Sequence, residues 1–99
     1  MHTAKAFGRM ELIKTQDAEA DLEYWKRSGN KKALKKLEQL FTELMEHPKT
    51  GTGKPEELKH NLSGFYSRHI IKKDRLVYEI KEEQGVVVVY SMRGHYLDK

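Results

Sequence analysis

The sequence has no cysteine and only two prolines among its 99 residues. The missing cysteines exclude disulfide bonds, thiolate metal ligands and cysteine nucleophiles, and their absence is typical of proteins that work in a reducing cytoplasm. No apolar run approaches the roughly 20 residues that a membrane-spanning helix needs. The first nine residues also lack the apolar centre of a signal peptide. We therefore expect a cytoplasmic protein without a membrane segment.

Charge is abundant by comparison. Charged residues make up 34% of the chain and hydrophobic residues 37%, and the mean hydropathy is -0.82. The formal net charge of +4 suits RNA, DNA or an acidic protein partner, although many small domains carry a similar excess. A chain of this length has room for one compact domain with a modest core. We assign residues 10–99 to that domain and interpret residues 1–9 as a cloning remnant or a disordered extension.

The first half of the chain predicts one strand and two helices. Residues 10–14 are typical of a short strand. Thr15 can cap a helix over residues 16–28, which Gly29 and Asn30 end. Apolar residues spaced by three and four predict a second amphipathic helix over residues 31–47, before Pro48. Because the connection is so short, the two helices should form an antiparallel hairpin.

The second half predicts a sheet. Residues 49–55 are rich in glycine and threonine and indicate a loop. Three strand-like runs follow at residues 65–71, 75–80 and 86–92, and their short connections require an antiparallel meander. The resulting fold class is α+β, in which the N-terminal strand and the two-helix hairpin pack on an antiparallel sheet completed by the three-strand meander. The helices should cover one sheet face and leave the other for a ligand.

Alternation along the strands separates two sets of side chains. Leu76, Tyr78 and Ile80 form the natural core set, so Arg75 should lie on the opposite face with Val77 and Glu79. There Arg75 could meet Glu56 and His95, although an arginine on a polar sheet face is by itself a common feature. Alternation in the preceding strand likewise sets Phe65, Ser67 and His69 apart from Tyr66, Arg68 and Ile70.

These residue types suit cleavage of RNA without a metal ion. A carboxylate can act as the base, an imidazole as the acid, and cationic side chains can stabilise the charge that builds on a phosphate. Basic side chains also alternate with aromatic ones, a mixture that can pair with phosphates and stack on bases. The mixture comprises Lys54, Lys59, Arg68, Arg75, Arg93, Phe65, Tyr66 and Tyr96.

Neither a metal site nor a cofactor site is predicted. The five histidines do not have metal-ligand spacing. The segment Gly51-Thr52-Gly53-Lys54-Pro55 lacks the spacing and the helix start of a phosphate-binding loop. A nucleotide-hydrolysing enzyme is therefore disfavoured.

The ordered motifs closely resemble the YoeB/Txe family of bacterial toxin-antitoxin toxins, in the RelE/ParE superfamily with its RelE-like microbial RNase fold. The resemblance covers residues 10–96. It implies a metal-independent endoribonuclease, an mRNA interferase that cuts mRNA in the A site of the 70S ribosome. It also implies inhibition by a YefM/Axe-like antitoxin and a homodimeric state. The motifs are Gly53-Lys54-Pro55-Glu56, Leu58-Lys59-His60-Asn61-Leu62-Ser63-Gly64-Phe65-Tyr66-Ser67-Arg68, Arg75-Leu76-Val77-Tyr78 and Arg93-Gly94-His95-Tyr96.

The resemblance also implies roles for particular residues. Glu56 takes the place of the general base, Arg75 of the arginine that stabilises the transition state, His95 of the general acid and Tyr96 of the terminal tyrosine. Lys59 matches a basic residue of the active site. The full set expected to bind RNA or phosphate is Lys54, Lys59, Arg68, His69 and Arg93.

Three features depart from the family pattern. His69 stands where close relatives have arginine, and Tyr66 stands where tryptophan is common. Residues 97–99 extend past the tyrosine that usually ends the chain.

Three other functions fit the same sequence. One is a ribonuclease that needs no ribosome. Another is a non-catalytic basic module that blocks the ribosome or acts only as an antitoxin-bound corepressor. The third is the gyrase-inhibiting branch of the superfamily, which the joint presence of Glu56, Arg75 and His95 disfavours.

Overall fold

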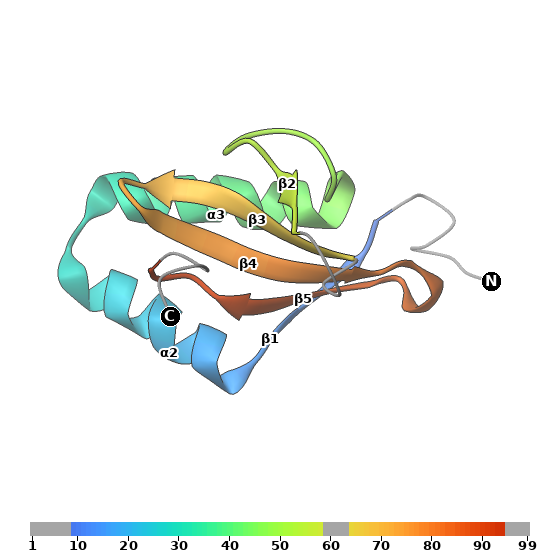
Figure 1. Cartoon of the computed structure of the whole chain (residues 1–99). Helices are drawn as coiled ribbons and strands as arrows, with labels where there is room; N and C mark the ends of the chain where they lie inside the picture. The colour runs from blue at the N-terminus through green and yellow to red at the C-terminus, as the bar shows by residue number, and fades with distance from the viewer. Residues whose placement is uncertain (1–8, 59–63, 95–99) are drawn as a thin grey trace.

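The computed structural model describes residues 9–58 and 64–94, which form two helices and five strands (Figure 1). The predicted strand at the N-terminus, both helices and all three strands of the meander are confirmed. The structure adds a two-residue strand that the sequence did not predict. In chain order the elements are β1 (Glu11–Lys14), α2 (Gln16–Ser28), α3 (Lys31–Glu46), β2 (Glu56–Glu57), β3 (Phe65–Ile71), β4 (Asp74–Lys81), the 3₁₀ turn η1 (Glu82–Gln84) and β5 (Val86–Ser91).

The strands form one sheet in the order β1-β5-β4-β3-β2. The segment from β3 to β5 is the predicted antiparallel meander. However, β1 pairs with β5 in parallel, with Leu12 opposite Val87, so the sheet is mixed rather than wholly antiparallel. The parallel pairing is possible because the two helices and the rest of the sheet separate β1 from β5 along the chain. The α+β class and the meander are thus confirmed, with one parallel pair at the edge.

Side chains and a glycine define the helix boundaries. The Thr15 hydroxyl accepts a hydrogen bond from the Ala18 amide at 3.1 Å and so caps α2. Gly29 ends that helix with φ of 72°, a conformation that glycine adopts without strain. The Asn30 side chain then caps α3 by accepting from the Ala33 amide at 3.0 Å. Among the described residues, neither helix is long and apolar enough to cross a membrane.

Both helices pack on one face of the sheet, where α3 lies behind β3 and β4 in Figure 1. The apolar spacing in α3 buries Leu37, Leu40 and Leu44, and each buried leucine contributes about 1.5 to 3 kcal/mol of transfer free energy. The Trp25 indole donates to the Met92 carbonyl at 2.8 Å and ties α2 to the end of β5. The buried core consists of Ala18, Trp25, Ala33, Leu37, Leu40, Leu44, Ile70, Leu76, Tyr78, Ile80, Val87, Val89 and Met92.

The opposite sheet face, called the open face below, carries Phe65, Ser67, His69, Arg75, Val77 and Glu79. The prediction that Leu76, Tyr78 and Ile80 face the core is confirmed by their burial. No helix of the described part of the chain covers the open face. Ser67 and Val77 in the middle of this face are nevertheless buried, at 3% and 8% exposure. A ligand can therefore reach only the partly exposed side chains around them.

Candidate functional site

The short strand β2 brings Glu56 to the open face. Glu56 pairs with Ser67 of β3, and Ser67 in turn pairs with Val77 of β4. Residues opposite each other in an antiparallel ladder point to the same face, so Glu56 shares the face of Ser67 and Val77. Arg75 precedes Val77 by two residues and also points there. Two strand spacings, about 10 Å, separate the backbones that carry Glu56 and Arg75.

Arg75 lies where the start of β4 meets the segment after β5. Its amide donates to the Gly94 carbonyl at 3.0 Å, and the Gly94 amide donates to the Asp74 carboxylate at 2.7 Å. The Arg75 Nε atom is buried and has no hydrogen-bond partner within residues 9–58 and 64–94. A buried N–H group without a partner costs free energy, so this guanidinium is well suited to donate hydrogen bonds to a bound anion.

Three of the predicted site residues lie outside the described residues. They are Lys59, His95 and Tyr96. Their assigned roles therefore stay predictions. The described chain stops at Gly94, the residue that precedes His95 and is hydrogen bonded to Arg75.

His69 pairs directly with Arg75 across β3 and β4. Its Nε2 atom meets the carbonyl oxygen of Lys72 in the turn between these strands. Because a carbonyl can only accept, Nε2 must carry the hydrogen, which leaves Nδ1 of the neutral ring as an acceptor. His69 can thus donate to a phosphate through Nδ1 only when the imidazole is protonated.

Arg68 is buried and cannot reach a ligand at the surface, so the prediction that it binds phosphate is wrong. Its exposed fraction is 0%. Five hydrogen bonds engage the side chain, the number of N–H groups that a guanidinium offers. They run to the Tyr78 hydroxyl at 3.0 Å, Glu43 Oε1 at 2.7 Å, and the carbonyls of Thr52 at 3.3 Å, His47 at 2.9 Å and Thr50 at 2.7 Å. Alternation grouped Arg68 with Tyr66 and Ile70, and the burial of Ile70 shows that this group faces the core.

The two other predicted phosphate ligands in the described residues occupy different places. Lys54 is exposed in the loop just before Glu56, and its φ of 52° is uncommon for a residue with a side chain. Arg93 is exposed, and its guanidinium lies 3.6 Å from the ring centroid of Tyr24 in α2. That stacking holds the Arg93 cation beside α2. Lys54 is therefore adjacent to Glu56 in the chain, whereas Arg93 is held at a helix.

Phe65, one of the aromatic residues expected to stack on bases, lies on the open face beside Tyr90, which sequence reasoning overlooked. The rings of Phe65 and Tyr90 are tilted with centroids 5.5 Å apart. The Tyr90 hydroxyl donates to Glu79 at 2.7 Å, and this hydrogen bond raises the pKa of Tyr90 above its ordinary value. Both rings are only half-buried. They offer a surface on which a base could stack.

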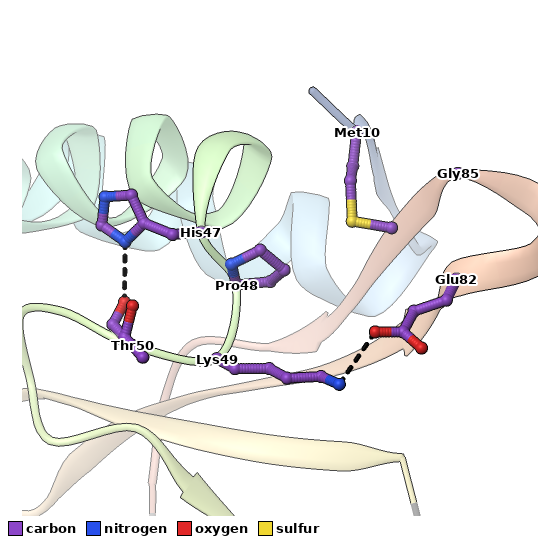
Figure 2. Close-up of a pocket in the computed structure, with 7 residues that line it drawn as sticks. All are labelled: Met10, His47, Pro48, Lys49, Thr50, Glu82 and Gly85. Carbon is purple, nitrogen blue, oxygen red and sulfur yellow. Dashed lines mark hydrogen bonds and ion pairs between the residues drawn. The ribbon is translucent and has the colours of Figure 1, made fainter. Parts of the chain in front are cut away.

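A separate hollow of about 400 Å³ lies at the opposite end of β4 from Arg75 (Figure 2). An ion pair of 2.8 Å between Lys49 and Glu82 borders it and raises the pKa of Lys49. The hollow contains neither Glu56 nor Arg75. Among the described residues, no group of three His, Asp or Glu side chains is arranged to hold a metal ion. The open face therefore carries the candidate site. The lining residues of the hollow are Met10, His47, Pro48, Lys49, Thr50, Glu82 and Gly85.

Residues 14–96 match the family model described as "YoeB-like toxin of bacterial type II toxin-antitoxin system". The chain belongs to this YoeB-like toxin family. The resemblance predicted from the motifs is thus confirmed, and the protein is a toxin of a type II toxin-antitoxin system.

Relatives of known sequence and structure agree with the family assignment. Toxin YoeB of Escherichia coli K12 is 39% identical over 87 residues, which cover 88% of this chain and all of the relative. The YoeB/ParE toxin from Agrobacterium tumefaciens superposes with a TM-score of 0.80 at 32% identity, covering 88% of this chain and 100% of that one. The YoeB dimer from Staphylococcus aureus gives 0.77 at 34% identity, covering 89% and 99%. That toxin is also solved in a heterotetrameric complex with YefM.

Proposed function

We propose that this toxin is an endoribonuclease, an mRNA interferase that cleaves mRNA in the ribosomal A site by metal-independent acid-base catalysis. The observation that carries the proposal is the placement of Glu56 and Arg75 on the same face of the sheet, the open face. An exposed carboxylate and a guanidinium whose Nε has no partner in the described chain lie on one accessible surface. Membership of the YoeB-like toxin family supports the same conclusion.

In the proposed reaction Glu56 takes the proton from a ribose 2′-hydroxyl. The 2′-oxygen attacks the adjacent phosphorus in line, and the bond to the 5′-oxygen breaks. His95 gives its proton to that departing oxygen, so the products are a cyclic or 3′ phosphate and a 5′-hydroxyl. Tyr96 orients a base by stacking.

Arg75 stabilises the negative charge that accumulates on the phosphate oxygens. A well-placed donor of this kind typically contributes about 3 to 4 kcal/mol to the transition state. Lys54, two residues before Glu56, and Lys59, three residues after it, assist by adding positive charge. His69, which pairs with Arg75, adds a further donor in its protonated form.

The ribosome supplies the orientation that a small open surface lacks. Glu56 is exposed and β2 is only two residues long, so the site encloses little of a flexible RNA strand. Correct orientation can account for about 7 to 11 kcal/mol of a barrier. The decoding site provides it by bending mRNA against the open face, which places the toxin in the cytoplasm during its action.

Two protein partners belong to the proposal. The Staphylococcus aureus relative is described both as a dimer and in a complex with YefM. This toxin accordingly forms a homodimer and is held inactive by an antitoxin similar to YefM.

A Glu56→Ala variant tests the proposed base. Cleavage of ribosome-bound mRNA should fall by roughly 10²- to 10⁴-fold, the usual contribution of a general base, while association with the ribosome persists. Glu57→Ala is the matched control, because Glu57 is also exposed and adjacent but pairs with Tyr66 and so points to the other face. Primer extension on an mRNA measures the cut positions and rates.

Two of the competing functions have their own outcomes in this assay. Equal rates and identical cuts on naked and ribosome-bound mRNA would identify a ribonuclease that needs no ribosome. Blocked translation without cuts would identify a non-catalytic module. Undiminished cleavage by Glu56→Ala would reject Glu56 as the base.

A further inference from the structure

The buried guanidinium of Arg68 joins three parts of the fold to the loop that leads to Glu56. Arg68 lies in β3, Tyr78 in β4 and Glu43 in α3, and the remaining bonds go to carbonyls of residues 47, 50 and 52. We call Arg68, Glu43, Tyr78 and Thr52 the Arg68 network. Its hydrogen bonds fix a long connection that otherwise has no strand or helix before β2.

Glu43 connects the Arg68 network to the amide and the hydroxyl of Thr52 in the loop. Its Oε1 atom accepts from both Arg68 and the Thr52 amide, at 2.7 and 2.8 Å. Its Oε2 atom accepts from the Thr52 hydroxyl at 2.7 Å. The Glu43 side chain is only 15% exposed. The carboxylate therefore neutralises a buried cation and holds the loop at the same time.

The loop approaches the network and β3 so closely that it requires glycine at two positions. A Cβ atom on Gly51 would lie 2.4 Å from Glu43 Oε1, and one on Gly53 would lie 2.8 Å from the His69 carbonyl. The Gly53 carbonyl in turn accepts from the His69 amide at 2.7 Å. Glu43 thus holds the loop on one side and β3 holds it on the other, three residues before Glu56.

The segment between this contact and Glu56 has little freedom of its own. Lys54 has φ of 52° and precedes Pro55, whose ring restricts the residue before it. Such a conformation is strained for a residue with a side chain and persists only where the surrounding structure enforces it. The position of Glu56 therefore depends on what holds residues 51–53.

We propose that Arg68 and Glu43 are positioning residues, whose buried ion pair fixes the loop and thereby places the Glu56 carboxylate for attack on RNA. This inference rests on the proposed function of Glu56. Because a misplacement of 1 Å can cost about 100-fold in rate, loosening the loop should lower the cleavage rate of saturated enzyme without weakening ribosome binding.

Two variants of different severity test the proposal. Glu43→Gln removes the charge from the network but keeps the size of the side chain. Thr52→Val keeps the ion pair and removes only the hydroxyl bonds to Glu43 and Gln39. It is the milder change and serves if Glu43→Gln does not fold. Their matched controls are Glu23→Gln, in an exposed pair with Arg27 at 3.6 Å, and Thr42→Val, whose hydroxyl is exposed on α3.

Three measurements apply to each folded variant. Single-turnover cleavage of ribosome-bound mRNA gives the maximal rate and the half-saturating concentration. Amide hydrogen exchange at Thr52 and His69 reports whether the loop has opened. We expect both network variants to exchange faster at these amides and to cut about 10- to 100-fold more slowly at an unchanged half-saturating concentration. Both controls should match the wild type.

Several outcomes would overturn the inference. Wild-type rates in a variant whose loop exchanges faster would show that the loop does not place Glu56. Slower cleavage with unchanged exchange would show that the effect does not pass through the loop. If the wild type does not cleave RNA at all, the proposed function fails by itself. Hydrogen exchange then decides alone whether the ion pair fixes the loop, and unchanged exchange in both variants would reject it.

Discussion

The hydroxyl of Tyr78 offers a sharp test of how the buried polar network contributes to stability. Tyr78 is fully buried. Its hydroxyl donates to the Pro48 carbonyl at 2.6 Å and accepts from Arg68 Nε at 3.0 Å. Burial raises the pKa of Tyr78, so the hydroxyl keeps the proton that it donates. Tyr78→Phe removes both hydrogen bonds and leaves the aromatic ring in place.

The expected cost follows from the two groups left without a partner. A buried donor or acceptor that loses its partner costs about 1 to 3 kcal/mol, and a charged donor costs more. We therefore expect Tyr78→Phe to lower the free energy of unfolding by at least about 2 kcal/mol. For a domain of this size that loss lowers Tm by roughly 8 to 16 °C.

Urea unfolding followed by the fluorescence of the single tryptophan measures this cost. Trp25 is 4% exposed and should report unfolding of the core. Tyr24→Phe is the control, because the Tyr24 side chain is 43% exposed and water can replace its hydroxyl contacts. Equal stability of the two variants would refute the idea that the Tyr78 hydroxyl is a required member of the network.

Three further predictions concern acid, packing and charge. Burial raises the pKa of Glu43, but the hydrogen bonds from Thr52, Arg68 and Gln39 together lower it by more, so the pKa lies below 4.5. The stability that Glu43 contributes should therefore be complete above pH 4.5 and lost as pH falls through the lowered pKa, and urea midpoints in Glu43→Gln should show a weaker acid dependence. Leu40→Ala should cost about 2 to 5 kcal/mol at an unchanged m-value, because Leu40 is fully buried. Arg75→Ala should slow cleavage at least as much as Glu56→Ala and, unlike it, reduce the salt dependence of RNA association.

Local patterns sufficed to predict most of the elements but not their order in the sheet. The spacing of apolar residues located α3, and the alternation of Leu76, Tyr78 and Ile80 identified the core face of β4. The parallel pairing of β1 with β5 could not be predicted, because it depends on neighbours more than 70 residues apart in the chain. Strand β2 was missed because two residues are too few to display an alternation.

The candidate site shows the same division between local and distant information. The shared face of Glu56 and Arg75 follows from strand alternation and one short pairing. Arg68 was misassigned because its ion-pair partner, Glu43, lies 25 positions away in a helix. Burial of a guanidinium is favourable only when such partners exist, and no nearby residue reveals them.

The place of β5 between β1 and β4 also determines when a growing chain can complete its fold. The amide of Thr15 donates to Val89, its hydroxyl donates to Tyr90, and Trp25 donates to Met92. The N-terminal elements therefore cannot complete their packing until β5 has been synthesised, near the end of translation. Such pairings between residues far apart in the chain slow folding. A nascent chain that has not reached residue 86 lacks the strand that joins β1 to the meander. A toxin of this fold therefore cannot complete its sheet until β5 has left the ribosome.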